Sequence, residues 1–324
     1  MTWAQTLHAE ILFSNSPLEA LHIPFLKALL DPLSVLFHYL GSTLFFMAIV
    51  SFVYICVDRR LGIRIALALL VAGILNGTCK ALLAYPRPIG LPYPSELGLM
   101  EGSYGLPSGH VQTAVALYGT IFLHARRVWV RWVTAFLILF MPIARMYAGL
   151  HFLGDVIGGA LLGLLVLLGL ELLLRKFPFI LEPGPTPELF SDEKRFKSYI
   201  LAIIAVTIPS VLLQESGQPE STTKSWEQVI SASGALAGFG ISILLNQKAG
   251  RDWSRASGFT EFAARLGIVI LGILVFYLLL GKILAWIAPE NPVARYFRYG
   301  IVCFYIGYLS PFLLKRIRGG TYLQ

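Results

Sequence analysis

Two cations, Lys80 and Arg87, lie near the end of the second long apolar stretch of the sequence. Lys80 and Arg87 are seven residues apart, so they lie on one face of a helix if the helix continues between them. Pro86 predicts that this helix ends nearby. Taken alone, such a pair is typical of long cationic side chains that extend from a helix end toward the membrane surface.

A second polar group opens an apolar stretch with Pro107, Ser108, Gly109 and His110. Ser108 is expected to cap a helix whose free amides point outward. Such a helix start attracts anions, because its unpaired N–H groups and its dipole face the ligand. An N-cap beside an interfacial histidine explains the same four residues equally well.

The third group contains Arg145, His151 and Asp155. The four-residue spacing puts the Asp155 carboxylate one helical turn from the imidazole. The carboxylate can then accept a hydrogen bond from one ring nitrogen and leave the other as a nucleophile or base. A metal site would need further ligands, and three nearby cations would repel the metal ion. Three cations and a helix N-terminus predict an anion site instead, and their geometry fits phosphate best.

The composition places these groups in a membrane protein. Of 324 residues, 56% are hydrophobic and 14% are charged, and the mean hydropathy is +0.71. Soluble domains have about 25% charged residues, so an ordinary cytosolic enzyme, a disordered chain and a disulfide scaffold are excluded. The three cysteines lie apart in apolar stretches and are interpreted as small buried side chains.

Apolar segments long enough to cross a bilayer recur along the chain. The expected fold is an all-α, polytopic membrane helical bundle of about nine transmembrane helices. A mixed segment at 17–30 precedes them and favours an interfacial helix. The expected spans are 34–57, 63–84, 108–125, 129–149, 152–174, 197–214, 228–246, 265–287 and 295–314.

The basic residues predict the orientation of these spans, since Lys and Arg gather in cytoplasmic loops. With nine spans, 18 of the 26 Lys and Arg residues fall on one side. The net charge of +8 therefore reflects topology, and no nucleic-acid partner is expected. The N-terminus and all three polar groups are expected outside the cytoplasm. The basic side contains Arg59, Arg60, Arg64, Arg126, Arg127, Arg131, Arg175, Lys176, Lys194, Arg195, Lys197, Lys248, Arg251, Arg255, Arg265, Lys315, Arg316 and Arg318.

A change in composition divides the chain. Prolines and acidic residues concentrate at 177–196, which predicts a cytoplasmic linker. We expect an interfacial segment at 1–33, a catalytic helical core at 34–176 and a four-helix membrane region at 197–324. The two halves share no sequence repeat, so an inverted-repeat transporter gains no support.

The three polar groups together resemble the signature motifs of the type 2 phosphatidic acid phosphatase superfamily, in its integral-membrane branch. That family has the patterns K-x6-RP, PSGH and SR-x5-H-x3-D, and the resemblance covers about residues 34–175. Ala144 stands where the family usually has serine. The missing hydroxyl is expected to weaken phosphate binding without removing the chemistry.

The resemblance implies a role for each motif residue. His151 would attack phosphorus and form a phosphohistidine, Asp155 would orient His151, and His110 would protonate the leaving oxygen and then activate water. No metal or other cofactor is implied, because fixed cations would stabilise the transition state. The phosphate would be held by Lys80, Arg87, Ser108, Gly109 and Arg145.

The layout of nine spans is similar to the glucose-6-phosphatase and sphingosine-phosphate phosphatase branches. A glycine-rich stretch at 233–240 also resembles a late helix of those branches, although close helix packing explains it more simply. The two branches act on a sugar phosphate and on a single-chain lipid phosphate. The layout therefore leaves the substrate open.

The expected function is hydrolysis of a lipid phosphate monoester or diphosphate at the extracytoplasmic face, in a bacterial inner membrane or an endoplasmic reticulum membrane. The loop 89–104 favours a lipid, because it mixes apolar residues with Tyr93 and Tyr104 and offers few side chains that could bind sugar hydroxyls. A sugar-phosphate phosphatase is the enzymatic alternative. A transporter or flippase of phosphorylated lipids is disfavoured because the charges lie at one face, and a soluble haloperoxidase is disfavoured by the composition.

Overall fold

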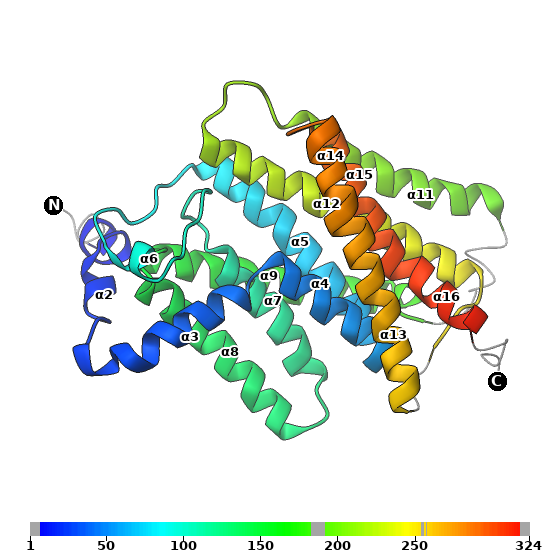
Figure 1. Cartoon of the computed structure of the whole chain (residues 1–324), viewed down its shortest axis with the longest axis horizontal. Coiled ribbons are helices and arrows are strands. Elements are labelled where there is room, and N and C mark those ends of the chain that lie inside the picture. The colour runs from blue at the N-terminus through cyan, green and yellow to red at the C-terminus, as the bar shows by residue number, and fades with distance from the viewer. Residues whose placement is uncertain (1–6, 183–191, 254–255, 257, 318–324) are drawn as a thin grey trace. The chain divides into compact units, whose positions relative to one another are not determined.

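The computed structural model describes residues 7–182, 192–253, 256 and 258–317. Within these ranges every regular element is a helix, which confirms the all-α fold class. Figure 1 labels the α-helices α2 (Ser16–Glu19), α3 (Lys27–Tyr39), α4 (Thr43–Phe52), α5 (Arg59–Leu83), α6 (Tyr93–Glu96), α7 (Gly109–His124), α8 (Val128–Tyr147), α9 (Leu153–Lys176), α11 (Glu193–Thr207), α12 (Glu220–Lys248), α13 (Phe259–Gly272), α14 (Leu280–Ile287), α15 (Pro292–Phe304) and α16 (Ser310–Ile317).

Seven helical stretches in the described ranges are long and apolar enough to cross a membrane. Each coincides with one of the nine expected spans. A pair of helices, Glu10–Glu19 and Pro24–Tyr39, bends by 70° and would add an eighth span if it crosses as one unit. The expected count of nine is therefore not confirmed. The seven stretches are Arg59–Leu83, Val128–Tyr147, Leu153–Lys176, Glu193–Leu212, Glu220–Lys248, Phe259–Ile287 and Pro292–Leu314.

Two expected spans differ from the helices that the structure has. The segment 34–57 is interrupted, because α3 ends at Tyr39 and α4 begins at Thr43. Gly41 lies in this break, where a β-carbon would overlap the His110 ring. The segment 108–125 forms α7, whose 16 residues extend about 24 Å. That length is less than the hydrocarbon thickness of about 30 Å.

Some sequence predictions fall outside the described ranges. The expected linker at 177–196 is described only near its two ends, because residues 183–191 are not described. Residues 1–6 of the expected interfacial segment are also outside, as are Arg255 and Arg318 of the basic set.

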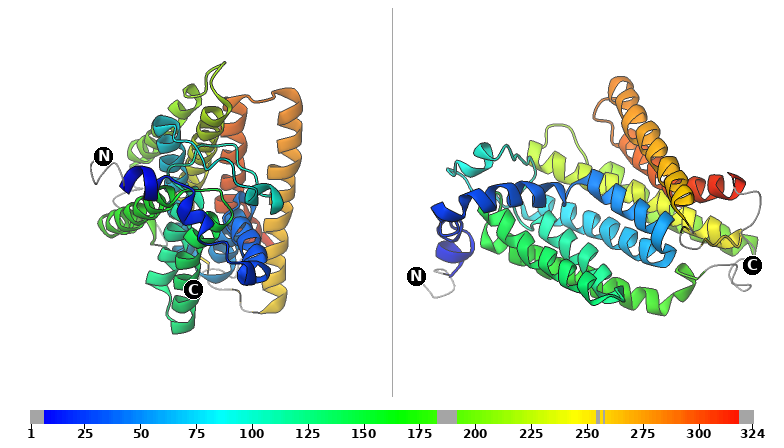
Figure 2. Two further views of the ribbon diagram at one scale, coloured as in Figure 1. Left: turned by 90° about the vertical axis from the view of Figure 1, so that its left-hand side faces the viewer. Right: turned by 60° about the horizontal axis from the view of Figure 1, so that its bottom comes forward.

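The chain divides into two compact units. The first unit comprises Met1–Met47, Val71–Gly169 and Ser216–Trp226. Its α7 and α8 form an antiparallel pair joined by a short turn, and α3 packs along α8 (Figures 1 and 2). On the other side of α7, Gly119 leaves room for the Leu167 side chain of α9. These contacts surround α7 with apolar helices, and much of its length is buried.

The first unit also holds the connection between α5 and α7 against its helices. Leu99 of this connection is buried with Ala148 and Leu150, which follow α8. The His22 ring stacks between the rings of Tyr93 and Tyr147, at centroid distances of 3.3 and 4.2 Å. The short stretch between α2 and α3 therefore contacts both the connection and the end of α8.

The second unit comprises Ala48–Leu70, Leu170–Glu215 and Glu227–Gln324. Helix α13 continues into α14 through a π-helical segment, Ile273–Leu279, and returns antiparallel through α15 (Figure 2). Gly234 and Gly238 of α12 lie against the backbone of α15, where a β-carbon would overlap it. The glycine-rich stretch therefore permits close helix packing, as the simpler interpretation predicts.

Candidate active site

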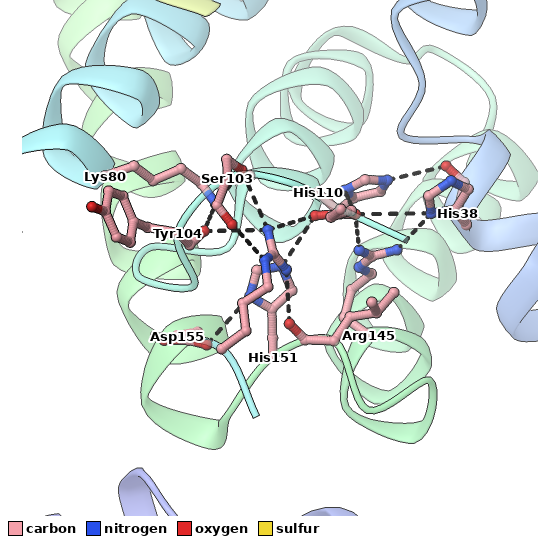
Figure 3. A network of polar contacts seen from close by, with 12 residues as sticks. His38, Lys80, Ser103, Tyr104, His110, Arg145, His151 and Asp155 are labelled. Atoms are coloured by element: carbon pink, nitrogen blue, oxygen red, sulfur yellow. Dashed lines mark hydrogen bonds and ion pairs between the residues drawn. The ribbon is translucent and has the colours of Figure 1, made fainter. Parts of the chain in front are cut away.

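All eight residues predicted for the site lie in the first unit, on four segments that meet at one end of the α7–α8 pair. In Figure 3, the side chains of Lys80, His110, Arg145 and His151 converge on one region, with Asp155 beside His151. The segments are the end of α5 with the residues after it, the start of α7, the last turn of α8, and the start of α9.

His151 and Asp155 form a fully buried pair. The His151 Nδ1 atom lies 3.3 Å from Asp155 Oδ2, which also accepts a hydrogen bond of 2.9 Å from the Phe152 amide. With Nδ1 donating to the carboxylate, Nε2 carries the ring lone pair. That atom lies 3.2 Å from Arg87 Nη1, so the unprotonated nitrogen faces the cations.

The environment of His151 favours the neutral imidazole. The residue lies in the turn between α8 and α9, where burial first and the Arg87 guanidinium second lower its pKa well below the ordinary value. A histidine attacks phosphorus only through an unprotonated nitrogen. The ring is therefore in the form that such chemistry requires at neutral pH.

The start of α7 is held by side chains of α5. Asn76 donates to the Pro107 carbonyl at 3.1 Å and to the Gln112 side chain at 2.8 Å, and Gln112 donates to the Ala72 carbonyl. The Ser108 amide donates to the Asp155 main-chain carbonyl at 2.9 Å. The first turn of α7 is thus tied to both α5 and α9.

The hydroxyl of Ser108 does not cap α7. Ser108 occupies the N-cap position, but its side chain makes no capping hydrogen bond, which corrects the sequence-based expectation. Its Oγ is fully buried and has no hydrogen-bond partner in the described part of the chain, and the same holds for Arg145 Nε. The Ser108 hydroxyl and the Arg145 Nε–H are therefore two buried donors that could bind a ligand.

Helix α5 carries Lys80 but ends before Arg87, so the two cations do not share one helical face. Ala84 adopts a left-handed conformation with φ 49°, and α5 stops at Leu83. An irregular stretch then carries Arg87 to the site. Gly105 lies against this stretch, where a β-carbon would come within 2.9 Å of both the Pro86 carbonyl and Asp155 Oδ2.

Lys80 and Arg87 both bind the end of the connection between α5 and α7. Lys80 Nζ lies 3.2 Å from Ser103 Oγ and also donates to the Tyr104 carbonyl. Arg87 donates to the Ser103 carbonyl at 2.6 Å and to the Tyr104 carbonyl at 3.2 Å. Both cations therefore have oxygen ligands from one short segment.

Glu101 lies at the centre of the site, a position that sequence reasoning missed. One carboxylate oxygen lies 2.7 Å from Arg87 Nη2, and the other forms an ion pair with Arg145. The first oxygen is 3.9 Å from His151 Nε2, and the second is 3.6 Å from His110 Nδ1. One carboxylate thus contacts two of the cations and lies within 4 Å of both histidines.

The electrostatic balance keeps Glu101 ionised. Its burial alone would raise the pKa, but the surrounding positive charges, led by Arg145, hold the pKa of this carboxyl well below its usual value. The site therefore stabilises a negative charge strongly at the point where the cations meet.

His38 of α3 is the second residue that sequence reasoning missed. Its ring accepts a hydrogen bond of 3.0 Å from Arg145 Nη1, and its carbonyl lies 3.1 Å from His110 Nε2. Since a carbonyl can only accept, His110 carries a proton on Nε2 and turns Nδ1 toward Glu101. His38 lies inside an apolar stretch with no motif around it, so no sequence signal pointed to it.

A metal ion would find its best ligands in His38, Glu101 and His110. Their ligand atoms all lie within 4.8 Å of one another. Arg145 donates to two of these three side chains, so a fixed cation already uses their lone pairs. The donor set therefore suits an anion between cations better than a metal ion.

Two family models match the chain. Residues 61–177 match the PAP2 superfamily, and residues 230–321 match the PAP2 superfamily phosphatase, transmembrane extension. The first match contains every predicted site residue. Together with the apolar helices, the second match identifies a multi-pass integral membrane protein.

Two curated proteins are similar to part of the chain. Sphingosine-1-phosphate phosphatase 2 of Homo sapiens is 26% identical over 137 residues, which is 40% of this chain and 34% of that protein. Phosphatidylglycerophosphatase B of Bacillus subtilis (strain 168) is 33% identical over 112 residues, 31% of this chain and 53% of that protein. The aligned part thus spans about a third and about half of these relatives. No solved structure matches the chain.

Proposed function

We propose that this protein is a metal-independent membrane phosphatase that hydrolyses a lipid phosphate through a phosphohistidine on His151. One observation carries the proposal: a single carboxylate contacts Arg87 and Arg145 and lies within 4 Å of both His110 and His151. A phosphate monoester bound at that point would have cations on its oxygens, a nucleophile on one side and an acid on the other.

In the first step, His151 Nε2 attacks phosphorus while the bond to the leaving oxygen breaks. Asp155 holds the proton on Nδ1 and stabilises the positive charge that develops on the ring. Lys80, Arg87 and Arg145 stabilise the charge on the phosphoryl oxygens. The Ser108 hydroxyl, which has no hydrogen-bond partner among the described residues, and the Gly109 amide would add neutral donors to the same oxygens.

His110 is proposed to act as the doubly protonated imidazolium, giving its Nδ1 proton to the leaving oxygen. The neutral ring that results then takes a proton on Nδ1 from the water that hydrolyses the phosphohistidine. The His38 carbonyl holds its Nε2–H, so Nδ1 is the atom that would exchange protons at the site. His38 is thus proposed as a positioning residue for His110.

A lipid substrate is favoured by two independent observations. Both relatives are named for phosphatases of lipid phosphates, sphingosine 1-phosphate and phosphatidylglycerophosphate. In this chain the residues before the site are apolar and exposed, including Ile89 and Met100 at 81% and 86%. Such side chains suit the membrane interface better than a pocket for a sugar.

The site is proposed to open on the extracytoplasmic side of its membrane. The support is the distribution of Lys and Arg, which lie mostly at the opposite ends of the helices that carry the site. On this proposal, the loops of the expected catalytic core at 34–176 that carry the site would face that side.

Phosphate release by the purified full chain tests the proposal. The substrates would be phosphatidic acid, phosphatidylglycerophosphate, sphingosine 1-phosphate, a polyprenyl diphosphate and glucose 6-phosphate, with and without EDTA. We expect hydrolysis of at least one lipid without added metal, and inhibition by vanadate. Equal efficiency on glucose 6-phosphate would favour the sugar-phosphate alternative, and loss in EDTA with recovery on adding Mg²⁺ would contradict metal independence.

A further inference from the structure

The three cations of the site are already bound by one short segment of the chain, Glu101–Tyr104. Glu101 pairs with Arg87 and Arg145, and the Ser103 and Tyr104 oxygens bind Lys80 and Arg87. A substrate phosphate needs these same donors. The segment and the phosphate therefore compete for one set of cations.

We propose that Glu101–Tyr104 is an internal ligand of the phosphate site, which a substrate phosphate displaces at each turnover. This inference rests on the phosphate-binding role proposed above for Lys80, Arg87 and Arg145. It adds to that role a resting state in which the site is closed by its own connection. It also makes Glu101 a determinant of substrate affinity.

The placement of the carboxylate supports displacement over a permanent structural role. Glu101 has its two oxygens on two different cations, as two phosphoryl oxygens would. It also occupies the point within 4 Å of both histidines, where the reacting phosphorus must sit. A group that remained there would exclude the substrate, so it has to leave during catalysis.

The segment is anchored on both sides of Glu101, which limits the movement to a few residues. Leu99 is buried against Ala148 and Leu150, and the Tyr104 hydroxyl is 2.9 Å from the Thr222 hydroxyl. Between these anchors, Gly102 is exposed, and a β-carbon added to it would make only ordinary contacts, with the Lys224 side chain at 3.5 Å and the Glu220 carboxylate at 3.8 Å. No side chain packs residue 102 against the protein, so the main chain from Glu101 to Tyr104 can move while the side chains of Leu99 and Tyr104 remain packed.

Protonation cannot release the segment near neutral pH, because the surrounding positive charges hold the pKa of Glu101 well below its usual value despite its burial. Only a competing anion can take its place. The segment therefore acts as a selectivity barrier, since a ligand must bind these cations better than a carboxylate to enter.

Substitution Glu101→Gln tests the proposal, because an amide keeps the size of the side chain and removes the charge. We expect the inhibition constants of inorganic phosphate and vanadate, and the KM, to fall about tenfold or more in the full-length purified protein. Glu96→Gln is the matched control, since Glu96 lies in the same connection but pairs with the exposed Lys27 at 3.4 Å. It should leave these constants unchanged.

Weaker binding of phosphate and vanadate by Glu101→Gln would overturn the proposal, because it would mean that Glu101 aligns the cations for the substrate. Vanadate binding can also be followed by the shift in thermal unfolding, which needs no turnover. Failure of the proposed function would appear as absent hydrolysis by the unmodified protein, whereas failure of this inference would appear as active protein with the opposite effect of Glu101→Gln.

A second variant makes the test independent of how Glu101→Gln folds. Ser103→Cys changes one atom in a partly buried part of the segment. We expect vanadate to accelerate its reaction with a soluble thiol reagent, because displacement exposes residue 103. Ser95→Cys, at an exposed position outside the segment, should react at the same rate with and without vanadate. Protection of residue 103 by vanadate would contradict displacement.

Discussion

The side chain and the main chain of Asp155 serve two different residues of the site. Its carboxylate accepts from the His151 ring and from the Phe152 amide, while its carbonyl accepts from the Ser108 amide. One residue of α9 therefore orients the proposed nucleophile and also fixes the start of α7. The two histidines nevertheless occupy different environments, which makes their proposed roles separable.

Substituting each histidine by alanine should separate nucleophile from acid. His151→Ala should lose nearly all activity, because no nucleophile remains. His110→Ala should lose roughly 10²- to 10⁴-fold on a lipid substrate but far less on a substrate with an acidic leaving group, which needs little protonation. Initial rates on the two substrates check this. Turnover of His151→Ala near that of the unmodified protein would refute the assignment.

Ser108→Ala should reduce activity without reducing stability. The hydroxyl has no hydrogen-bond partner among the described residues, so its removal breaks no contact of the folded state. A hydrogen bond to a charged group contributes about 1.5–3 kcal/mol, which corresponds to roughly a tenfold to 150-fold loss in kcat/KM. Kinetics and thermal unfolding measured together check both parts. A lowered melting temperature with unchanged kcat/KM would assign the hydroxyl to folding.

At the scale of the elements, the proposed topology requires α7 to cross the membrane, so that the site lies on one side and the turn between α7 and α8 lies on the other. Its 16 residues are shorter than the hydrocarbon thickness by the usual rise per residue. However, α7 is buried by α8, α9 and α5, so it lies mainly against protein. A helix can be short where protein rather than lipid surrounds most of its length, as for residues 111–120 of α7.

Labelling of single cysteines should therefore place the two ends of α7 on opposite sides. Ser95→Cys precedes α7 and should react with a membrane-impermeant thiol reagent in intact cells, whereas Arg126→Cys, in the turn between α7 and α8, should not. Both positions are exposed, so access to each depends only on topology. Reaction of both would show that α7 does not cross, and the reverse pattern would invert the proposed orientation.

Sequence reasoning could find residues that lie in short, regularly spaced groups. His151 and Asp155 are one helical turn apart, so local geometry brings this pair together. Ser108, Gly109 and His110 are consecutive at a helix start, so they too form a recognisable group. Glu101 has no such partner nearby, because its position depends on how the connection between α5 and α7 folds back over the cations. Glu101 is one of two acidic residues between Arg87 and Ser108, together with Glu96, so the sequence did not single it out.

Among the helices too, local sequence patterns could be predicted, whereas contacts between distant segments could not. Seven expected spans coincide with long apolar helices, because hydropathy over about 20 residues is a strong signal. The interruption between α3 and α4 was missed, since Gly41 in this break lies against the His110 ring, which comes from a distant part of the sequence. That interruption accompanies the approach of His38 to the site, which composition alone could not predict.

At the scale of the whole molecule, the proposed substrate must combine a phosphate with an apolar body. The phosphate site is buried, with the Arg145 and His151 side chains exposed by 1% and 0%, whereas the residues before it are exposed and apolar. A lipid held at the membrane surface would present its headgroup to the buried phosphate site and keep its chains near the exposed apolar residues.

The KM should fall with acyl chain length across soluble short-chain phosphatidic acids. Each methylene that partitions into the membrane contributes about 0.8 kcal/mol, which is about fourfold in apparent affinity. The kcat should change little, because the added methylenes lie far from phosphorus. The series is measured below the critical micelle concentration with glucose 6-phosphate as the comparison. A KM independent of chain length would contradict entry from the membrane.

The contact between Tyr104 and Thr222 has a consequence for how the gene can be divided. Residues 216–226 belong to the first unit, although they follow the PAP2 match at 61–177 by almost forty positions. A truncated protein that stops at residue 176 would contain every motif residue and lack the hydroxyl that anchors Tyr104. We expect that fragment to be poorly active by itself and to regain activity when residues 192–324 are co-expressed as a separate polypeptide. Complementation would be lost with Thr222→Val in the second polypeptide, whereas full activity of the first fragment alone would show that the anchor is dispensable.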